Sequence, residues 1–508
     1  MKTDTLTQKY FFKLSTNFVT LLSNIIIQFL VPRALGPHNY GIYHYLFSFF
    51  QQTTSFAELG TTQAYLTKLS KRQEDKGLIS FYFLFIIVIS AIIILLILLF
   101  QLTDLYSIVW PGQKLNFIYL AAFISLSFWY SNLLLNTSDA LGFTIKTEKV
   151  RIQQKIFALI ILVSLFFFDE LNLFNFFLFN IFTLCMLVFH LFYSIFINEE
   201  NSYKLYLIKP NFKKYIEEFH GFSKPLFLLG LIGTFIILFD RWLLQIYYGN
   251  EEQGFFGLAF QLSYVCLLFS TAMMPLITRE FSVVFAQNNI GELSSLFRKY
   301  IPTIYSFVCF IACFIAVNST NIVVTLAGKS FYSASIAVSI MSFYPIHQVY
   351  GQLGGSVFMA SEKTVIYSKI GIFTLLPGLP LTYFLIGPVE MNCLNLGAMG
   401  LAIKMVIIQI ISVNVQLFYI SKYLNLNFIK YFSHQFIVIG FFLFTAFITN
   451  MTINYYFQDT KIIYILFLNL FIYSILIILI ALLKPKLFGL DKNMIHTYIK
   501  KKYSNDNR

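Results

Sequence analysis

Long apolar stretches alternate with short polar connections along nearly the whole chain. The stretches are about 18 to 28 residues long, and at 1.5 Å per residue a helix of that length crosses a hydrocarbon core of roughly 30 Å. Strands of a membrane barrel would be shorter and would alternate in polarity. The pattern predicts an all-α integral membrane protein with about fourteen transmembrane helices, at residues 12–34, 41–66, 78–102, 116–137, 151–168, 172–197, 225–248, 254–278, 300–318, 333–358, 364–386, 398–421, 434–454 and 461–483.

A short glycine motif occurs twice, between the first and second and between the seventh and eighth predicted spans. Its three positions recur with identical spacing, as Gly36, Gly41 and Tyr43 and then as Gly249, Gly254 and Phe256. Six spans separate the copies, so both copies face the same side of the membrane. The chain is therefore predicted to hold two six-helix lobes in parallel repeat, related by an axis along the membrane normal.

The longest polar connection follows the sixth predicted span and marks the boundary between the two lobes. We expect an N-lobe over residues 1–205 and a C-lobe over residues 206–430. The last two spans, with a tail, form an added segment over residues 431–508. The connections on the outer side are short, so no outside domain is predicted.

Composition and charge agree with a membrane protein. Hydrophobic residues make up 58% of the chain and charged residues only 12%, too little polar surface for a soluble globule of 508 residues. Thirty of the 36 lysine and arginine residues lie in connections that share one side if the N-terminus is cytoplasmic. Basic connections resist translocation, so both termini are predicted to be cytoplasmic, and the net charge of +13 needs no nucleic-acid partner.

Several short elements carry a resemblance to a known family. They are Pro-Arg-Ala-Leu-Gly-Pro at 32–37 leading to Tyr-Gly-Ile-Tyr at 40–43, Glu-Leu-Gly at 58–60, Asp-Arg at 240–241, the segment 275–279 and the glycine-rich segment 397–400. In their order and placement they resemble the polysaccharide flippase branch of the multidrug/oligosaccharidyl-lipid/polysaccharide (MOP) exporter superfamily, in particular the O-antigen (Wzx-like) flippases. The resemblance covers nearly the whole chain. Family members often have Tyr at the position of Phe256, so one hydroxyl contact is in doubt.

The resemblance implies a transporter that flips undecaprenyl-diphosphate-linked oligosaccharide repeat units of O-antigen, capsule or a related glycan. Transport would run from the inner to the outer leaflet of a bacterial cell membrane, by alternating access. The implied partners are this lipid-linked substrate, membrane lipids, H⁺ or Na⁺ as a coupling ion, and other polysaccharide assembly proteins. No cofactor, metal or nucleic acid is expected.

Three basic residues are candidates for a cationic cavity that binds the diphosphate. A charge at the centre of a span costs about 2.5 to 3.5 kcal/mol, so it needs a cavity or a partner. Arg33 lies near the outer end of the first span, and Arg241 lies about 12 Å inside the outer end of the seventh, at an approximately corresponding place. Lys404 lies in the twelfth span. The alternatives are that Arg33 and Lys404 reach the membrane interface and that Arg241 pairs with a neighbouring carboxylate.

Acidic residues are candidates for ion coupling and for gating. Glu58 either binds a coupling H⁺ or Na⁺ or pairs with a lysine such as Lys404, and Asp240 is a second carboxylate that could titrate. Near the inner ends of the fourth and eighth spans, inside-gate candidates are Asp139, Arg279 and Glu280, for which interfacial anchoring is the alternative.

Other functions fit the sequence less well. A multidrug or cation antiporter of the same superfamily would more often have twelve helices and a less basic cavity. A lipid II flippase shares the helix count, so sequence alone does not separate it from an O-antigen or capsule flippase. A membrane glycan polymerase or another enzyme would need catalytic groups, but the chain has no large outside domain, no paired carboxylates in its first outside connection and no phosphate-binding loop motif. We therefore expect a transporter and not an enzyme.

Overall fold

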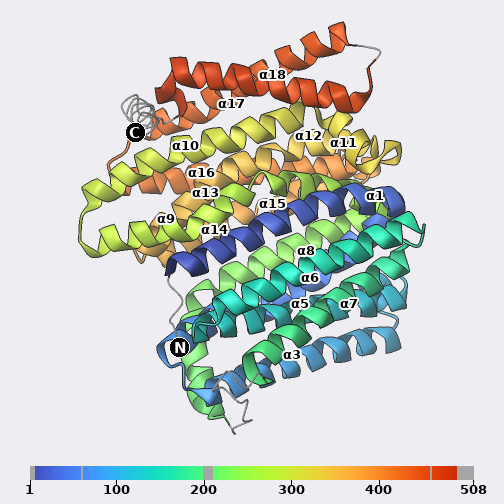
Figure 1. Cartoon of the computed structure of the whole chain (residues 1–508), viewed down its shortest axis with the longest axis vertical. Coiled ribbons are helices and arrows are strands. Elements are labelled where there is room, and N and C mark those ends of the chain that lie inside the picture. The colour runs from blue at the N-terminus through green and yellow to red at the C-terminus, as the bar shows by residue number, and fades with distance from the viewer. Residues whose placement is uncertain (1–5, 59–60, 198–209, 458–459, 489–508) are drawn as a thin grey trace, which may run out of the picture. The chain divides into compact units, whose positions relative to one another are not determined.

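The computed structural model describes residues 6–58, 61–197, 210–457 and 460–488 (Figure 1). All regular structure in these ranges is helical, which confirms the all-α prediction. The chain divides into two compact units, Met1–Gly257 (unit 1) and Leu258–Arg508 (unit 2). The lobe boundary near residue 205 stays a prediction.

Unit 1 is built around one central helix, α5. This helix packs against α1, α2, α3, α6 and α7, and most of its apolar centre is buried. Its buried face carries small residues such as Ala121, Ser125 and Ser131, which let neighbouring backbones approach closely in a membrane. The elements of the unit are α1 (Leu6–Glu58), α2 (Thr61–Lys71), α3 (Lys76–Leu102), α4 (Tyr106–Val109), α5 (Leu115–Leu141), α6 (Thr144–Phe167), α7 (Leu173–Phe192), a π-helical turn (Tyr193–Ile197) and most of α8 (Phe212–Val265).

Unit 2 is centred on two helices, α13 and α16. They pack against each other, and a Cβ added to Gly354 of α13 would lie 3.0 Å from Ile420 of α16. The elements are α9 (Leu268–Ala286), α10 (Ile290–Val317), α11 (Ser319–Ala327), α12 (Ala334–Met341), α13 (Phe343–Ala360), α14 (Thr364–Leu375), α15 (Gly378–Ile386), α16 (Gly397–Tyr423), α17 (Phe428–Tyr456), α18 (Ile462–Leu483) and the 3₁₀ turns Lys329–Phe331, Val389–Met391 and Pro485–Phe488.

Eleven helical stretches among the described residues are long and apolar enough to cross a membrane. Two of them, Phe11–Glu58 and Phe227–Val265, each run through one predicted span and into the next. The predicted span at 333–358 is divided between α12 and α13, and the span at 364–386 between α14 and α15. The chain is thus a multi-pass membrane protein, while the count of fourteen spans and the cytoplasmic placement of both termini stay predictions.

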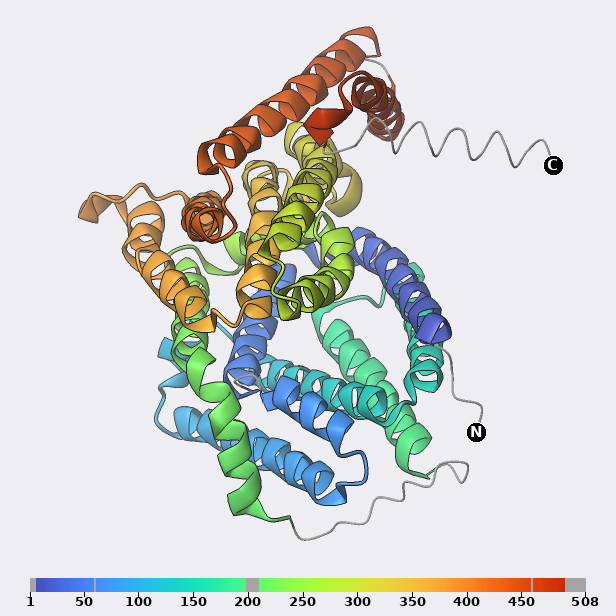
Figure 2. The same cartoon turned by 90° about the vertical axis from the view of Figure 1, so that its left-hand side faces the viewer.

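The first glycine of each motif breaks its helix. Gly36 interrupts α1 with φ 68° and ψ 170°, and Gly249 interrupts α8 with φ 72° and ψ −159°. This combination of positive φ and extended ψ is almost confined to glycine. In Figure 2 the parts of α1 before and after the break, dark and lighter blue, form two separate rods. The repeated glycine therefore marks the same backbone feature twice.

The second glycines of the two motifs bring the copies into contact within unit 1. A methyl group on Gly41 would overlap the carbonyl oxygen of Asn250, and one on Gly254 would overlap the carbonyl oxygen of Pro37. The offset that relates Gly41 to Gly254 also relates Pro37 to Asn250, so each contact is the repeat-related partner of the other. The copies therefore meet backbone against backbone, with a local twofold relation.

Candidate functional site

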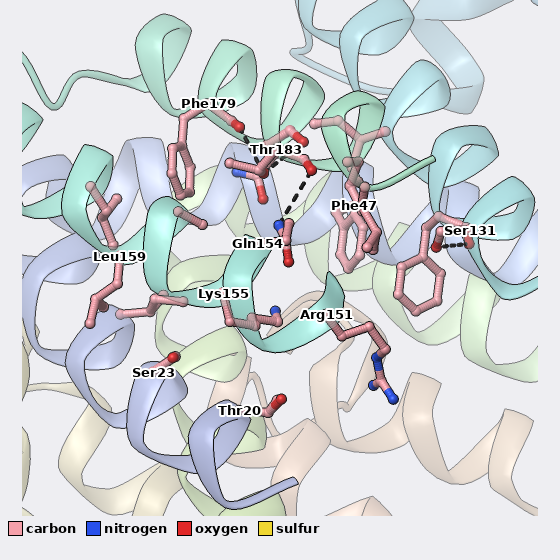
Figure 3. Close-up of a pocket in the computed structure, with 18 of the residues that line it drawn as sticks. Thr20, Ser23, Phe47, Ser131, Arg151, Gln154, Lys155, Leu159, Phe179 and Thr183 are labelled. Atoms are coloured by element: carbon pink, nitrogen blue, oxygen red, sulfur yellow. Dashed lines mark hydrogen bonds between the residues drawn. The ribbon is translucent and has the colours of Figure 1, made fainter. Parts of the chain in front are cut away.

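A cavity of about 370 Å³ lies inside unit 1, between α1, α5, α6 and α7 (Figure 3). Its volume is at the lower end of the range for small-ligand sites, so it suits a head group and not a whole oligosaccharide. Among the residues that the structure describes, basic side chains line it and no carboxylate does. The lining includes Thr20, Ser23, Tyr43, Phe47, Phe128, Asn132, Arg151, Gln154, Lys155, Phe179, Asn180 and Thr183.

The basic residues of the cavity come from one face of α6. Arg151 and Lys155 are four residues apart, so their side chains follow each other along the helix. Lys155 lies about 17 Å along α6 from its first residue, which is deep in a helix long enough to span the membrane. Within the described part of the chain the Lys155 ammonium has neither a hydrogen bond nor an ion pair. A charge at this depth without a protein partner indicates a site for an anion.

Polar atoms beside these cations also face the cavity without partners. Gln154 donates from Nε2 to the carbonyl oxygen of Thr183 at 3.3 Å, but its buried Oε1 accepts no hydrogen bond from a described residue. The hydroxyl of Thr20 is likewise buried and unsatisfied among these residues. Buried polar atoms are normally hydrogen-bonded, so the wall offers contacts to a ligand or to water.

Aromatic rings form much of the opposite wall. Tyr43, the aromatic residue of the first motif, lies 4.6 Å from Phe176 between ring centroids and donates to Oδ1 of Asn180 at 3.5 Å. Phe47 stacks on Tyr43 at 5.6 Å. The first glycine motif therefore contributes directly to the cavity through Tyr43, which the sequence analysis predicted only as a structural residue.

A second cavity of about 300 Å³ adjoins the first and shares Asn132, Leu135 and Arg151 with it. Two ion pairs lie in its wall. Lys13 pairs with Asp139 at 2.7 Å, and Arg151 pairs with Glu148 at 3.0 Å. The first turns of α1 and α6 and the last turn of α5 meet here, at the end of unit 1 that the charge distribution predicts to be cytoplasmic. Arg151 thus stands where the two cavities join.

Arg241, predicted to line a cationic cavity, is buried in a local network. Its Nη1 donates to Oε1 of Gln253 at 2.9 Å, and its guanidinium carbon lies 4.5 Å from the centroid of the Phe256 ring. Gln253 in turn donates from Nε2 to the Arg241 carbonyl at 2.5 Å. Arg241 does not line the cavity described above, and its role in substrate binding stays a prediction.

The hydrogen bonds show which residues correspond in the two halves. Tyr40 donates to Oε1 of Gln28 at 3.0 Å. The offset that relates the two glycine motifs also relates Tyr40 to Gln253 and Gln28 to Arg241, which are hydrogen-bonded to each other in the second copy. By this offset Arg241 corresponds to Gln28, five residues before Arg33, whose place was expected to correspond only approximately. Arg33 is exposed, with its guanidinium carbon 4.2 Å from the centroid of Phe29.

The other predicted charges are placed as follows. Asp240 is 3% exposed beside Arg241, and Glu58 is the partly buried last residue of α1. In unit 2, Lys404 is buried in α16, and a Cβ on Gly378 would lie 2.9 Å from its Cε. Their roles in substrate binding and ion coupling stay predictions.

Two of the three inside-gate candidates, Asp139 and Glu280, have partners within their own units. Asp139 in unit 1 accepts from Lys13 and also from the hydroxyl of Thr144, at 2.8 Å. In unit 2, Glu280 accepts a hydrogen bond from Tyr300, while Arg279 is exposed. These contacts are typical of anchoring, and gating by these residues stays a prediction.

Sequence reasoning missed Arg151, Lys155 and Gln154 as site residues. The two basic residues had been counted among those of a cytoplasmic connection, although they also fall within the predicted span 151–168. Their four-residue spacing was the available signal, because it places two charges on one face of a helix. Because the positive-inside rule already accounted for these two charges, their position on one face of a helix was not considered.

Comparison with known proteins gives one family and one fold. Residues 6–280 match the family model described as polysaccharide biosynthesis protein. A solved structure of the lipid II flippase MurJ, inward closed, matches with a TM-score of 0.62 at 14% identity, covering 94% of this chain and 99% of that one. An inward-facing multidrug resistance MATE family transporter matches with a TM-score of 0.58 at 13% identity, covering 82% and 98%. No curated protein matches the sequence significantly.

The family match covers more than half of the chain, and the structural matches show the fold. A MOP superfamily transporter from Pyrococcus furiosus shares it too, with a TM-score of 0.50 at 13% identity over 82% of this chain and 94% of that one. The solved structures named here are all of transporters, and they share this fold. The chain belongs to the polysaccharide biosynthesis protein family, and its fold is that of the MOP superfamily transporters it matches.

Proposed function

We propose that the chain flips undecaprenyl-diphosphate-linked oligosaccharide repeat units, of O-antigen, capsule or a related glycan, from the inner to the outer leaflet of the bacterial cell membrane. The observation that carries this proposal is the cavity of unit 1, which is lined by Arg151 and Lys155 and, as far as the described residues extend, by no carboxylate. Guanidinium and ammonium groups bind phosphate oxygens strongly, the former with two parallel hydrogen bonds. A diphosphate would neutralise both charges.

The cavity supports a division of the substrate into parts. The diphosphate lies between Arg151 and Lys155, and the first sugar contacts the polar atoms of Gln154 and Thr20. The prenyl chain stays in the lipid, since the cavity is too small to hold it. The adjoining cavity at the predicted cytoplasmic end offers an entry route that leads to Arg151. The remaining sugars extend away from the site, which explains how one cavity could serve a long glycan.

A multidrug or cation antiporter is disfavoured by the same observation. A cationic ligand would be repelled in this site, because the wall holds two positive charges close together. A lipid II flippase remains the nearest alternative, because its substrate carries the same diphosphate. The two substrates differ in their sugars, so the phenotype of a strain that lacks the gene distinguishes them.

The test is complementation in a strain that lacks the gene. Lys155→Gln removes the deep positive charge, and Lys149→Gln is the matched control, since Lys149 is exposed on the same helix and outside the cavity wall. We expect loss of surface glycan and accumulation of lipid-linked repeat units on the inner face with Lys155→Gln, at normal expression, and full rescue with Lys149→Gln.

Other outcomes would redirect the proposal. Equal rescue by both variants would remove the cavity from the transport route. Changed drug sensitivity with normal glycan would indicate an antiporter, and impaired peptidoglycan synthesis with normal surface glycan would indicate lipid II as the substrate.

A further inference from the structure

A buried carboxylate holds the arginine of the cavity. Glu148 is 3% exposed, and both of its carboxylate oxygens lie 3.0 Å from the same nitrogen, Nη1, of Arg151. The two residues are three apart on α6, so one turn of helix fixes the pair. Glu148 lines only the second cavity, whereas Arg151 lines both. The carboxylate therefore reaches Arg151 from one side of the junction.

The pair leaves most of the guanidinium available. A guanidinium carries five N–H donors, and Glu148 uses one nitrogen. Across the described ranges Arg151 makes no other hydrogen bond. A ligand in the first cavity can therefore make its first contact with the guanidinium before Arg151 leaves Glu148.

Arg151 is the cation that neutralises Glu148, because the neighbouring charges are otherwise engaged or lie in the first cavity. The second cavity brings Lys13 from α1 and Asp139 from α5 near the pair, but these two are bound to each other at 2.7 Å. Lys155 lies on the next turn of α6, within the first cavity. A diphosphate that draws Arg151 away would leave Glu148 buried without a cation, which is costly. Binding of the ligand and pairing with Glu148 thus oppose each other.

We infer that Glu148 is a resident anion that competes with the substrate diphosphate for Arg151 and so sets how tightly the substrate is held. This inference rests on the proposed function, because it assigns a regulator to the same site. A transport site must bind its ligand well enough to load and weakly enough to unload. Glu148 stabilises the empty site and favours release, and it admits only ligands with enough negative charge to displace it.

Binding to the purified full-length protein tests the inference, with farnesyl diphosphate as the probe. Glu148→Gln keeps the shape and removes the competing charge, so we expect about tenfold tighter binding, within the usual range of such couplings. Arg151→Gln should weaken binding by a similar factor. In the double variant the gain from Glu148→Gln should disappear, because there is no longer an arginine to release. Glu170→Gln, an exposed carboxylate after α6, controls for the change in net charge.

Two further measurements keep the inference falsifiable. Glu148→Asp retains the charge but shortens its reach, so a gain of about two- to threefold is expected even if Glu148→Gln folds poorly. Cells complemented with Glu148→Gln should export less glycan despite tighter binding, because release is slower.

The possible failures are distinguishable. Unchanged or weaker binding by Glu148→Gln, with binding still lost in Arg151→Gln, would overturn the competition and leave the proposed function standing. A gain in Glu148→Gln that persists in the double variant would also overturn it. Unchanged affinity in both Arg151→Gln and Lys155→Gln would instead overturn the cavity as the diphosphate site, and the inference with it.

Discussion

The two copies of the glycine motif share a backbone but not a chemistry. Gly36 and Gly249 break their helices with nearly the same torsion angles, and the second glycines make equivalent contacts. Around this frame, the first copy has a neutral pair, Gln28 with Tyr40, where the second has a charged pair, Arg241 with Gln253. The duplicated backbone was thus kept, while the side chains that brace it diverged.

One position shows why the side chains had to diverge. His44 and Gly257 each follow the second glycine of their motif by the same number of positions, and they lie against each other. A Cβ on Gly257 would come within 2.9 Å of Cγ of His44, so the space near the local twofold holds one large side chain and not two. Contacts that a repeat makes with itself cannot use the same bulky residue twice. Asymmetry in this region is therefore a packing requirement.

The largest effect should come from the second glycines. Gly41→Ala and Gly254→Ala each place a methyl group on a backbone carbonyl of the other copy, and a carbonyl in a helix cannot move aside as a side chain can. We expect each to lower the free energy of unfolding by about 3 kcal/mol or more, as severe overpacking does. Thermal unfolding in detergent measures this, with Gly233→Ala as the control because its added methyl group meets nothing within 4 Å. If either variant matches Gly233→Ala, the copies do not meet as described.

The second effect should differ between the two hydrogen-bonded pairs, Arg241 with Gln253 and Gln28 with Tyr40. Arg241→Met removes a buried charge-assisted hydrogen bond and leaves the Gln253 side chain without its donor, which should cost about 2 to 3 kcal/mol. Gln28→Met removes a neutral hydrogen bond at the corresponding place and should cost about 1 kcal/mol. The two unfolding midpoints, measured side by side, check the difference. Equal losses would mean that the charge in the second copy adds nothing to its stability.

The third effect should be equal in the two copies. Gly36→Ala and Gly249→Ala meet no neighbouring atom within 4 Å, so their cost is backbone strain alone, about 1 to 3 kcal/mol. Because the torsion angles are similar, the two losses should agree within experimental error. Gly440→Ala in α17, also without near neighbours and without a positive φ, should cost little and serves as the control. A marked difference between the two copies would show that one break is not needed for the fold.

The sequence predicted the frame of this molecule better than its site. Glycine spacing was enough to find the repeat, because a torsion that only glycine adopts leaves a residue signature. The match of Arg33 with Arg241 was only approximate, because similar depth in two spans does not specify register, whereas the hydrogen bonds match Arg241 with Gln28. Arg151 and Lys155 were missed because a basic helix end serves topology and ligand binding alike. Only packing of α1, α5, α6 and α7 around them reveals a cavity.

The smallest effect concerns the beginning of α8, the helix that leads into the second motif. Glu218 accepts from Arg72 at 2.6 Å and lies 3.2 Å from Lys68, while Tyr215 donates to Asp75 at 2.6 Å. These contacts attach the beginning of α8 to α2 and to the turn between α2 and α3. The part of α8 before the second glycine motif is therefore anchored at its start by these contacts and at its end by the contacts of the motif itself.

Hydrogen bonds from Arg72 hold the pKa of Glu218 below its ordinary value of 4.5. A depressed pKa means that the folded state prefers the charged carboxylate, so the stabilisation is complete above about pH 4.5 and is lost as the pH falls through the lowered pKa. Glu218→Gln should therefore be less stable than the parent by up to about 1 kcal/mol at pH 7, with the gap closing in acid. Glu217→Gln, an exposed neighbour, is the matched control. A gap that stays constant with pH would show that the ion pair does not hold α8.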